Sequence, residues 1–179
     1  MLLLSYGFVP DTANRHDAYT LRLRLDPTDP QCIAKAALLQ AQGLQQCVSF
    51  PIKLEGWPVG MLQHAAFVAI RTDSAEELAE VAVQLLSSQG GKSTAEGNAY
   101  ERIGVSHVMT QCKAALGAYR SSMQSDRALE EELQSRVVQS STEETITRER
   151  QLITARIRIQ ERRILQRTIF MLSELRRQL

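Results

Sequence analysis

Apolar and polar residues alternate in two short segments near the start of the chain. Residues 19–25 read Tyr-Thr-Leu-Arg-Leu-Arg-Leu, a period of two that predicts a half-buried strand with Leu21, Leu23 and Leu25 facing the core. Residues 48–54 place Val, Phe, Ile and Leu at every second position. We therefore expect a second strand there that pairs with the first, and these two strands are the only regular sheet that the pattern predicts.

The segments around these strands carry turn and helix signals. Residues 2–9 form an apolar run that predicts a short buried strand ending at Pro10, and the turn-rich residues 11–17 follow it. The Asp-Pro-Thr-Asp-Pro sequence at residues 26–30 breaks the chain and precedes a predicted helix over 31–42.

Three further signals mark helix ends. Gly43 is placed to end the helix over 31–42. Pro58 is expected in the first turn of a helix that runs to Ile70, where the N–H that proline lacks has no helical partner anyway. Ser74-x-x-Glu77 is a capping box that opens a further helix to about Ser87.

The second half of the chain is dominated by two long apolar stripes with helical spacing. Apolar residues recur at steps of three and four over residues 100–133 and again over 146–178, which predicts two long amphipathic helices. Burying a side chain of this size contributes about 1.5–3 kcal/mol, so the two stripes should pack together. The polar residues 134–145 suit the turn of an antiparallel hairpin, and a coiled-coil dimer is the alternative. The expected fold is mainly α, a multi-helix lobe with two long antiparallel helices and a small two-stranded β element near the N-terminus.

Charge is spread unevenly along a chain that is nearly neutral as a whole. The 179 residues carry a net charge of +1, but residues 146–179 hold nine Arg against three Glu, or +6, which leaves −5 for the rest. Such a basic segment is either a surface for an acidic protein or nucleic acid, or an ordinary solvated helix face. No stretch approaches the ~20 apolar residues of a membrane span, so no membrane partner is expected.

The sequence offers little local chemistry. No Cys-x-x-Cys pair or local histidine motif is present, so neither a disulfide framework nor a metal site is predicted; the residues concerned are Cys32, Cys47, Cys112, His16, His64 and His107. Gly90-Gly91-Lys92-Ser93 lacks the spacing and the preceding strand of a phosphate-binding loop, and we expect a helix connection there. No nucleophile lies beside a base.

Several segments, taken in order, resemble one family. Residues 4–10 and 14–21 resemble the end of the SET domain in plant Rubisco large-subunit lysine methyltransferases. The later matches are Trp57-Pro58-Val59-Gly60-Met61-Leu62, Cys112-Lys113-Ala114-Ala115-Leu116-x-x-Tyr119 with Asp126-Arg127, and Arg156-Ile157-Arg158-x-x-Glu161-Arg162-Arg163-Ile164-Leu165.

The resemblance implies a two-part enzyme in which a SET core binds S-adenosylmethionine and a helical C-terminal lobe binds the protein substrate. Residues 1–18 would then be the C-terminal remnant of the SET domain, and residues 19–179 the substrate-binding domain. The family's role for the aromatic residues of the Ser-Tyr-Gly-Phe segment falls on Tyr6 and Phe8, which would line the cofactor and lysine channel. Both rings could equally be ordinary core residues.

The departures from the family pattern concern the catalytic machinery. The family's catalytic tyrosine and its cofactor-binding Gly-rich and Asn-His motifs lie upstream of Tyr6 and are not present in the sequence. We therefore expect that the chain alone neither holds S-adenosylmethionine nor transfers a methyl group, whatever a longer protein does.

The resemblance also suggests partners and a location. The substrate protein would be the Rubisco large subunit, an aldolase or another non-histone protein, and the chain would also contact the missing SET core. The location would be the chloroplast if the plant-type resemblance holds, and otherwise the cytoplasm or nucleus. A stand-alone helical interaction protein is the alternative. Nonspecific nucleic-acid binding through the Arg-rich last helix is a third hypothesis, and we do not count nucleic acid among the expected partners.

One acidic residue lies on an apolar stripe. Helical geometry places Asp126 near Tyr119 and Met123, and a buried carboxylate needs a partner. We expect Arg150 or Arg156 on the opposing helix to supply a structural ion pair, with contact to the substrate protein as the alternative.

Overall fold

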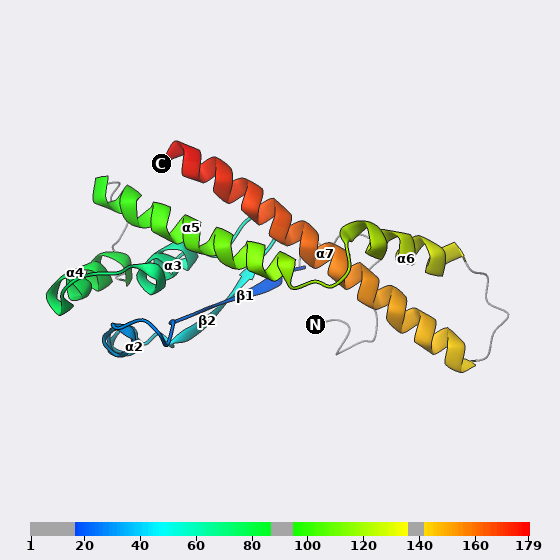
Figure 1. Ribbon diagram of the computed structural model, residues 1–179, viewed down its shortest axis with the longest axis horizontal. Helices are drawn as coiled ribbons and strands as arrows, with labels where there is room; N and C mark the ends of the chain where they lie inside the picture. Colours follow the sequence, from blue (N-terminus) through cyan, green and yellow to red (C-terminus); the bar gives the residue numbers. More distant parts are fainter. Residues whose placement is uncertain (1–16, 87–94, 136–141) are drawn as a thin grey trace.

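The mainly helical fold with a small two-stranded sheet near the N-terminus is confirmed (Figure 1). The computed structural model describes residues 17–86, 95–135 and 142–179. Along the chain these form β1 (Tyr19–Arg24), α2 (Cys32–Ala41), β2 (Cys47–Ile52), α3 (Met61–Ala69), α4 (Ala75–Leu86), α5 (Ala95–Gly117), α6 (Met123–Ser135) and α7 (Thr142–Gln178). The predictions for residues 2–9 and 90–93 lie outside the described residues.

The sheet has the predicted antiparallel pairing. Tyr19 lies opposite Ile52, and Arg24 lies opposite Cys47. Leu21, Leu23 and Leu25 are buried, whereas the polar residues between them are exposed. The period of two therefore sorted the two faces of β1 correctly.

The short helices end largely as the sequence predicts. Gly43 has φ +70°, and the N–H of Leu44 donates to the carbonyl of Leu39 at 2.9 Å, the pattern of a Schellman motif. The hydroxyl of Ser74 accepts the N–H of Glu77 at 3.1 Å. The other half of the box differs, because the Glu77 carboxylate accepts the N–H of Asp73 rather than that of Ser74.

The expected position of Pro58 is wrong. Helix α3 begins only at Met61, and Gly60 precedes it with φ +84°. Because a left-handed residue cannot continue a right-handed helix, Pro58 lies in the turn before α3, where its carbonyl accepts the N–H of Met61 at 3.3 Å.

Helix α2 contains a buried lysine that the sequence pattern did not predict. Lys35 is fully buried, and its ammonium group donates to Asp29 at 2.8 Å, to the carbonyl of Val68 at 3.2 Å and to the carbonyl of Ile70. These carbonyls lie at the C-terminal end of α3, where a cation is favoured by the helix dipole. Lys35 thus ties α2 to α3.

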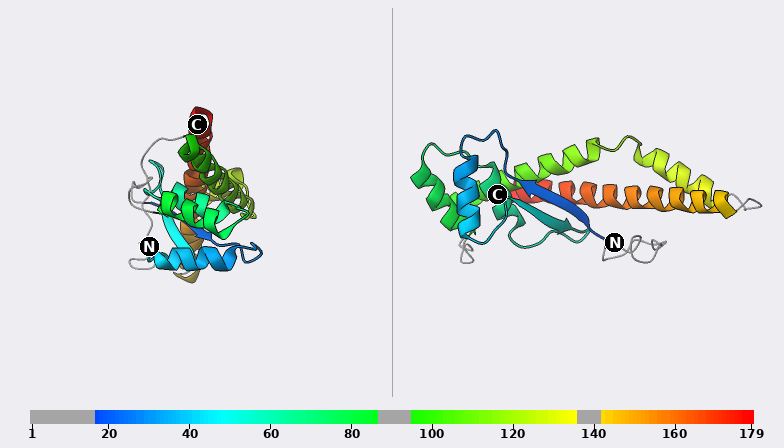
Figure 2. Two further views of the ribbon diagram at one scale, coloured as in Figure 1. Left: turned by 90° about the vertical axis from the view of Figure 1, so that its left-hand side faces the viewer. Right: turned by 90° about the horizontal axis from the view of Figure 1, so that it is seen from below.

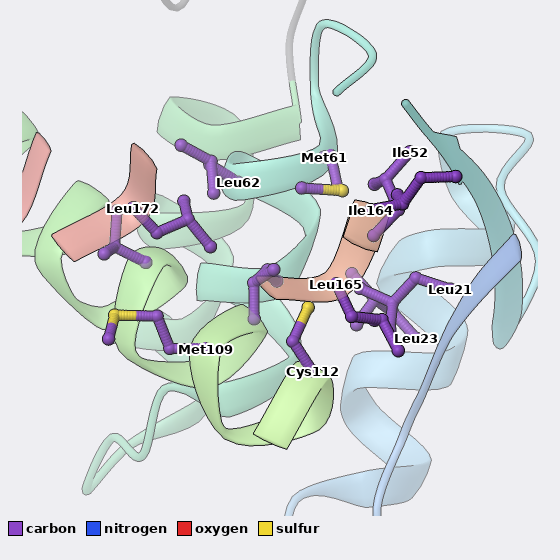
Figure 3. Close-up of a cluster of buried hydrophobic side chains, with 13 residues drawn as sticks. Leu21, Leu23, Ile52, Met61, Leu62, Met109, Cys112, Ile164, Leu165 and Leu172 are labelled. Atoms are coloured by element: carbon purple, nitrogen blue, oxygen red, sulfur yellow. The ribbon is translucent and has the colours of Figure 1, made fainter. Parts of the chain in front are cut away.

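The main core joins the sheet to α3, α5 and α7 (Figure 3). Helices α3 and α5 approach so closely that a Cβ on Gly104 would lie 2.2 Å from the carbonyl oxygen of Leu62. A second core forms between α2, α3 and α4 around Leu39, Phe67 and Leu78.

The first of the two predicted long helices is broken. Residues 118–122 separate α5 from α6, and both helices run antiparallel to the 37-residue α7 (Figures 1 and 2). The break is stabilised locally, because the hydroxyl of Ser122 accepts the N–H of Ser125 at 2.9 Å and Arg162 donates to the carbonyl of Ser121. An N-terminal cap starts a new helix at this point. The antiparallel pairing of the stripes within one chain is confirmed.

No helix among the described residues is long and apolar enough to cross a membrane. Within the same ranges, no group of His, Cys, Asp and Glu is arranged to hold a metal ion.

Candidate functional site

A groove of about 510 Å³ lies between the start of β1, the C-terminal half of α5 and the middle of α7. It is lined by both backbone and side chains of these elements: Ala18, Tyr19, Thr20, Leu21, Arg22, Gln111, Ala114, Ala115 and Glu161. The two alanines on α5 are small, so this wall leaves space for another group.

Among the described residues, the strand that borders the groove has an open edge. Among the described residues β1 pairs with β2 alone. The N–H of Leu25 donates to the carbonyl of Gln46 directly opposite, at 3.2 Å, which makes the odd-numbered residues of β1 the hydrogen-bonded ones. The backbone groups of Thr20 and Arg22 therefore point away from β2. Pro51 opposite Thr20 fits this assignment, since its missing N–H faces away from β1.

The half-buried carboxylate of Glu161 lines the groove, and one of its two oxygens is hydrogen-bonded. The Tyr119 hydroxyl donates to Oε2 of Glu161 at 2.6 Å. Burial, then the hydrogen bond and the charge of Glu161, raise the pKa of Tyr119 well above its ordinary value. Burial also raises the pKa of Tyr19, with the charge of Glu161 adding to it. Both phenols therefore stay protonated at neutral pH, and the Tyr119 hydroxyl is the donor to Glu161.

A buried ion pair holds the elements behind the groove. Asp126 is 1% exposed, and its carboxylate lies 2.9 Å from Arg158 and 3.1 Å from Arg162. The Ser121 hydroxyl donates to it at 3.0 Å.

The ion pair at Asp126 was predicted, but its expected partners, Arg150 and Arg156, are wrong. Arg156 pairs instead with Glu130 at 3.0 Å. The break before α6 moves this helix along α7, so that Asp126 faces a later turn of α7 than an unbroken helix would reach.

Two adjacent residues of α7 have different roles: Glu161 lines the groove, whereas Arg162 is buried in the core. The guanidinium of Arg162 lies 4.6 Å from the centre of the Tyr119 ring, a cation–π contact, while it is bound to Asp126. Across the described ranges no cationic side chain is within ion-pair distance of Glu161. The carboxylate is therefore available to a cation that enters the groove.

Four of the nine arginines of α7 bind groups of α6. Arg148 donates to the carbonyl of Leu133, and Arg156, Arg158 and Arg162 bind carboxylates of α6. Much of the positive charge of the last segment thus fixes the α6–α7 hairpin, while Arg163 and Arg167 remain exposed.

The structure does not test the predicted cofactor residues, because Tyr6 and Phe8 lie outside the described residues. None of the residues that line the groove is among those that the resemblance assigns to S-adenosylmethionine. The buried Cys112 is not a nucleophile, because burial raises the pKa of its thiol to about 12.

Sequence reasoning missed the groove. Tyr119 and Glu161 both lie within the motifs that carry the family resemblance. Neither residue is close to the other in sequence, and only the packing of α5 on α7 brings them together.

Together, the helical lobe, the charged groove and the open strand edge among the described residues are features of a binding domain. The family model described as Rubisco LSMT substrate-binding matches residues 26–165. The chain belongs to this family.

Relatives with known names and structures agree with this assignment. The chain is 30% identical over 131 residues to the pea (Pisum sativum) ribulose-1,5 bisphosphate carboxylase/oxygenase large subunit N-methyltransferase, chloroplastic. The match covers 73% of this chain and 26% of the pea protein, so the chain spans about a quarter of that relative's length.

Solved structures share the fold. A structure of Rubisco LSMT bound to AdoMet superposes with a TM-score of 0.71 at 24% identity, covering 99% of this chain and 38% of that one. A second, of Rubisco LSMT bound to sinefungin and monomethyllysine, gives a TM-score of 0.69 at 25% identity, covering 97% and 38%.

Proposed function

We propose that the chain is the client-binding lobe of a protein-lysine N-methyltransferase, where the client is the protein to be methylated. The observation that carries this proposal is the family match over residues 26–165, which corresponds to a substrate-binding region. The methyl-transfer machinery would lie in residues that this chain does not contain.

The proposed division of the chain follows from the resemblance. Residues 1–18 would close the SET domain of a longer protein, and residues 19–179 would form the binding domain. Tyr6 and Phe8 would line the channel for S-adenosylmethionine and lysine in that longer protein. Without the upstream motifs, the chain alone neither binds the methyl donor nor catalyses transfer.

The client is inferred from the pea relative, whose name specifies the Rubisco large subunit. We propose Rubisco as the first client to test, with aldolase or another non-histone protein as alternatives, and the chloroplast as the location. A SET core elsewhere in the same protein would be the second partner.

The geometry suits this role because a methyl transfer needs the reacting atoms aligned at about 3–3.5 Å. A lobe that positions a large client must itself be rigid. The ion pair from Asp126 to Arg158 and Arg162, with Tyr119 beside it, fixes α5, α6 and α7 to one another. Glu161, which lines the groove, is the neighbour of Arg162 on α7, so a client bound there would be held by a fixed frame.

The proposal separates binding from catalysis, and two measurements test this. Titration calorimetry of S-adenosylmethionine into the purified chain should give no heat of binding, and a methylation assay with Rubisco should show no turnover. Saturable binding of the methyl donor would refute the proposed division. A stand-alone interaction protein predicts the same two results, and an in-frame SET core in the coding sequence upstream of Met1 would decide against that alternative.

A further inference from the structure

The open edge of β1 is exposed where it borders the groove. Thr20 and Arg22 both line the groove, and their N–H and C=O groups point away from β2. Two residues along a strand are about 7 Å apart, which matches the spacing at which an added strand forms its hydrogen bonds. An open edge of this kind is a template for pairing with another extended segment.

The groove is also lined by two side chains of opposite charge, Glu161 and Arg22. Glu161 and Tyr19 both line the groove. Arg22 is three residues further along β1, which corresponds to about 10 Å in a strand. The Tyr119 hydroxyl donates a hydrogen bond to Oε2 of Glu161. No described residue supplies a partner for Oε1. An incoming cation would therefore find one carboxylate oxygen accessible and already oriented.

We propose that this groove takes an extended segment of the client protein as an added strand on β1, with a lysine or arginine side chain at Glu161. This inference rests on the proposed function, because the occupant is the client. The charge layout specifies the segment further: in a segment that runs parallel to β1, an acidic side chain three residues after the basic one would meet Arg22. The small side chains of Ala114 and Ala115 leave room for the added backbone.

The backbone part of the proposal is tested with a synthetic eight-residue peptide, Thr-Val-Lys-Val-Thr-Glu-Val-Thr, capped at both ends. Amide hydrogen exchange by NMR should show fast exchange at Thr20 and Arg22 in the free chain. Saturating peptide should slow both amides at least tenfold, while Leu21 and Leu23 stay protected throughout. Unchanged exchange at Thr20 and Arg22 in the presence of millimolar peptide would overturn the proposal.

Peptides methylated on backbone nitrogens provide a control that keeps the charges. Two isomers are compared, one methylated on the amides of the odd-numbered residues and one on those of the even-numbered residues. Strand addition uses only one edge of the peptide, so one isomer should lose binding and the other should keep it. Equal binding of both isomers would show that the backbone does not pair with β1.

The side-chain part is tested with matched variants of the full chain. Ala114→Leu fills the groove from an exposed position on α5, and Ala99→Leu makes the same change at an exposed position outside it. Glu161→Gln removes the charge in the groove but leaves an acceptor for Tyr119, and Glu174→Gln removes a charge elsewhere on α7. We expect Ala114→Leu and Glu161→Gln to weaken peptide binding about tenfold or more, and both controls to bind like the original chain.

Binding of Rubisco to the same variants separates this inference from the proposed function. If Rubisco binds the original chain and Ala114→Leu equally well, the client-binding role stands and the groove is not its site. If the peptide results hold but Rubisco does not bind, the groove is a strand-binding site and Rubisco is not the client.

Discussion

Gly104 sets the distance between α3 and α5 at the scale of a single residue. Because an added Cβ would meet the Leu62 carbonyl oxygen at 2.2 Å, the backbone of one helix must move to admit any side chain. We expect Gly104→Ala to lower the free energy of unfolding by about 1–3 kcal/mol, measured by urea denaturation.

Gly117 is the matched control at the end of the same helix. A Cβ there meets nothing within 4 Å, so Gly117→Ala should be neutral or slightly stabilising, because alanine restricts the unfolded chain more than glycine does. Equal losses for the two variants would contradict the packing account.

His64 gives the fold a dependence on pH. Its side chain is buried, and burial, with a smaller effect of the charge of His107, lowers its pKa to about 4. The unfolded chain keeps the ordinary value of about 6.5 and binds the proton more tightly. Stability is therefore complete above pH 6.5 and is lost progressively as the pH falls towards 4.

Between pH 7 and pH 5 we expect His64 to account for a loss of about 2 kcal/mol in the free energy of unfolding. Urea denaturation across this range should show the loss, and His64→Gln should remove most of the slope. A smaller slope should remain, because burial and the charge of Lys35 also lower the pKa of His107. An unchanged slope in His64→Gln would refute this assignment.

At the scale of the elements, the break between α5 and α6 decides which side chains meet. Ser122 caps α6 through the N–H of Ser125 at 2.9 Å, and such caps contribute about 1 kcal/mol. We expect Ser122→Ala to speed amide exchange in the first turns of α6 several-fold while α3 stays protected. Gln124→Ala, an exposed change in the same helix, is the control, and it should leave the exchange of α6 unchanged.

The same break shows what the sequence could and could not predict about the elements. Periodicity found β1, β2 and both apolar stripes because each buries one regular face. It predicted a single helix over 100–133, because the apolar stripe continues across residues 118–122. The stripe does not reveal the two contacts made at the break, which are the Ser122 cap and the bond from Arg162 to the Ser121 carbonyl. The Ser122 cap was readable from the sequence, whereas the bond from Arg162 to the Ser121 carbonyl depends on tertiary packing.

The candidate site was less predictable than the fold for a related reason. Ion pairing at Asp126 followed from burial, but its partners depended on a register that the break had changed. The groove depends on which edge of β1 is free and on the meeting of Tyr119 with Glu161, 42 residues apart. Neither feature has a local sequence signal.

At the scale of the whole molecule, the lobe has two parts with different shapes. A body formed by the sheet, α2 to α5 and the end of α7 carries the groove, and the α6–α7 hairpin extends from it (Figure 2). The arginines that bind α6 fix this hairpin along much of its length. A rigid extended lobe is suited to contact a large client at more than one point.

The most direct test of this account is co-sedimentation of the purified 179-residue chain with Rubisco, and in parallel with aldolase, without S-adenosylmethionine. The account predicts saturable co-sedimentation with one of these clients at micromolar concentrations, although no methyl donor is present. Failure to co-sediment with either protein at tens of micromolar would contradict the claim that this chain binds the two clients named for it.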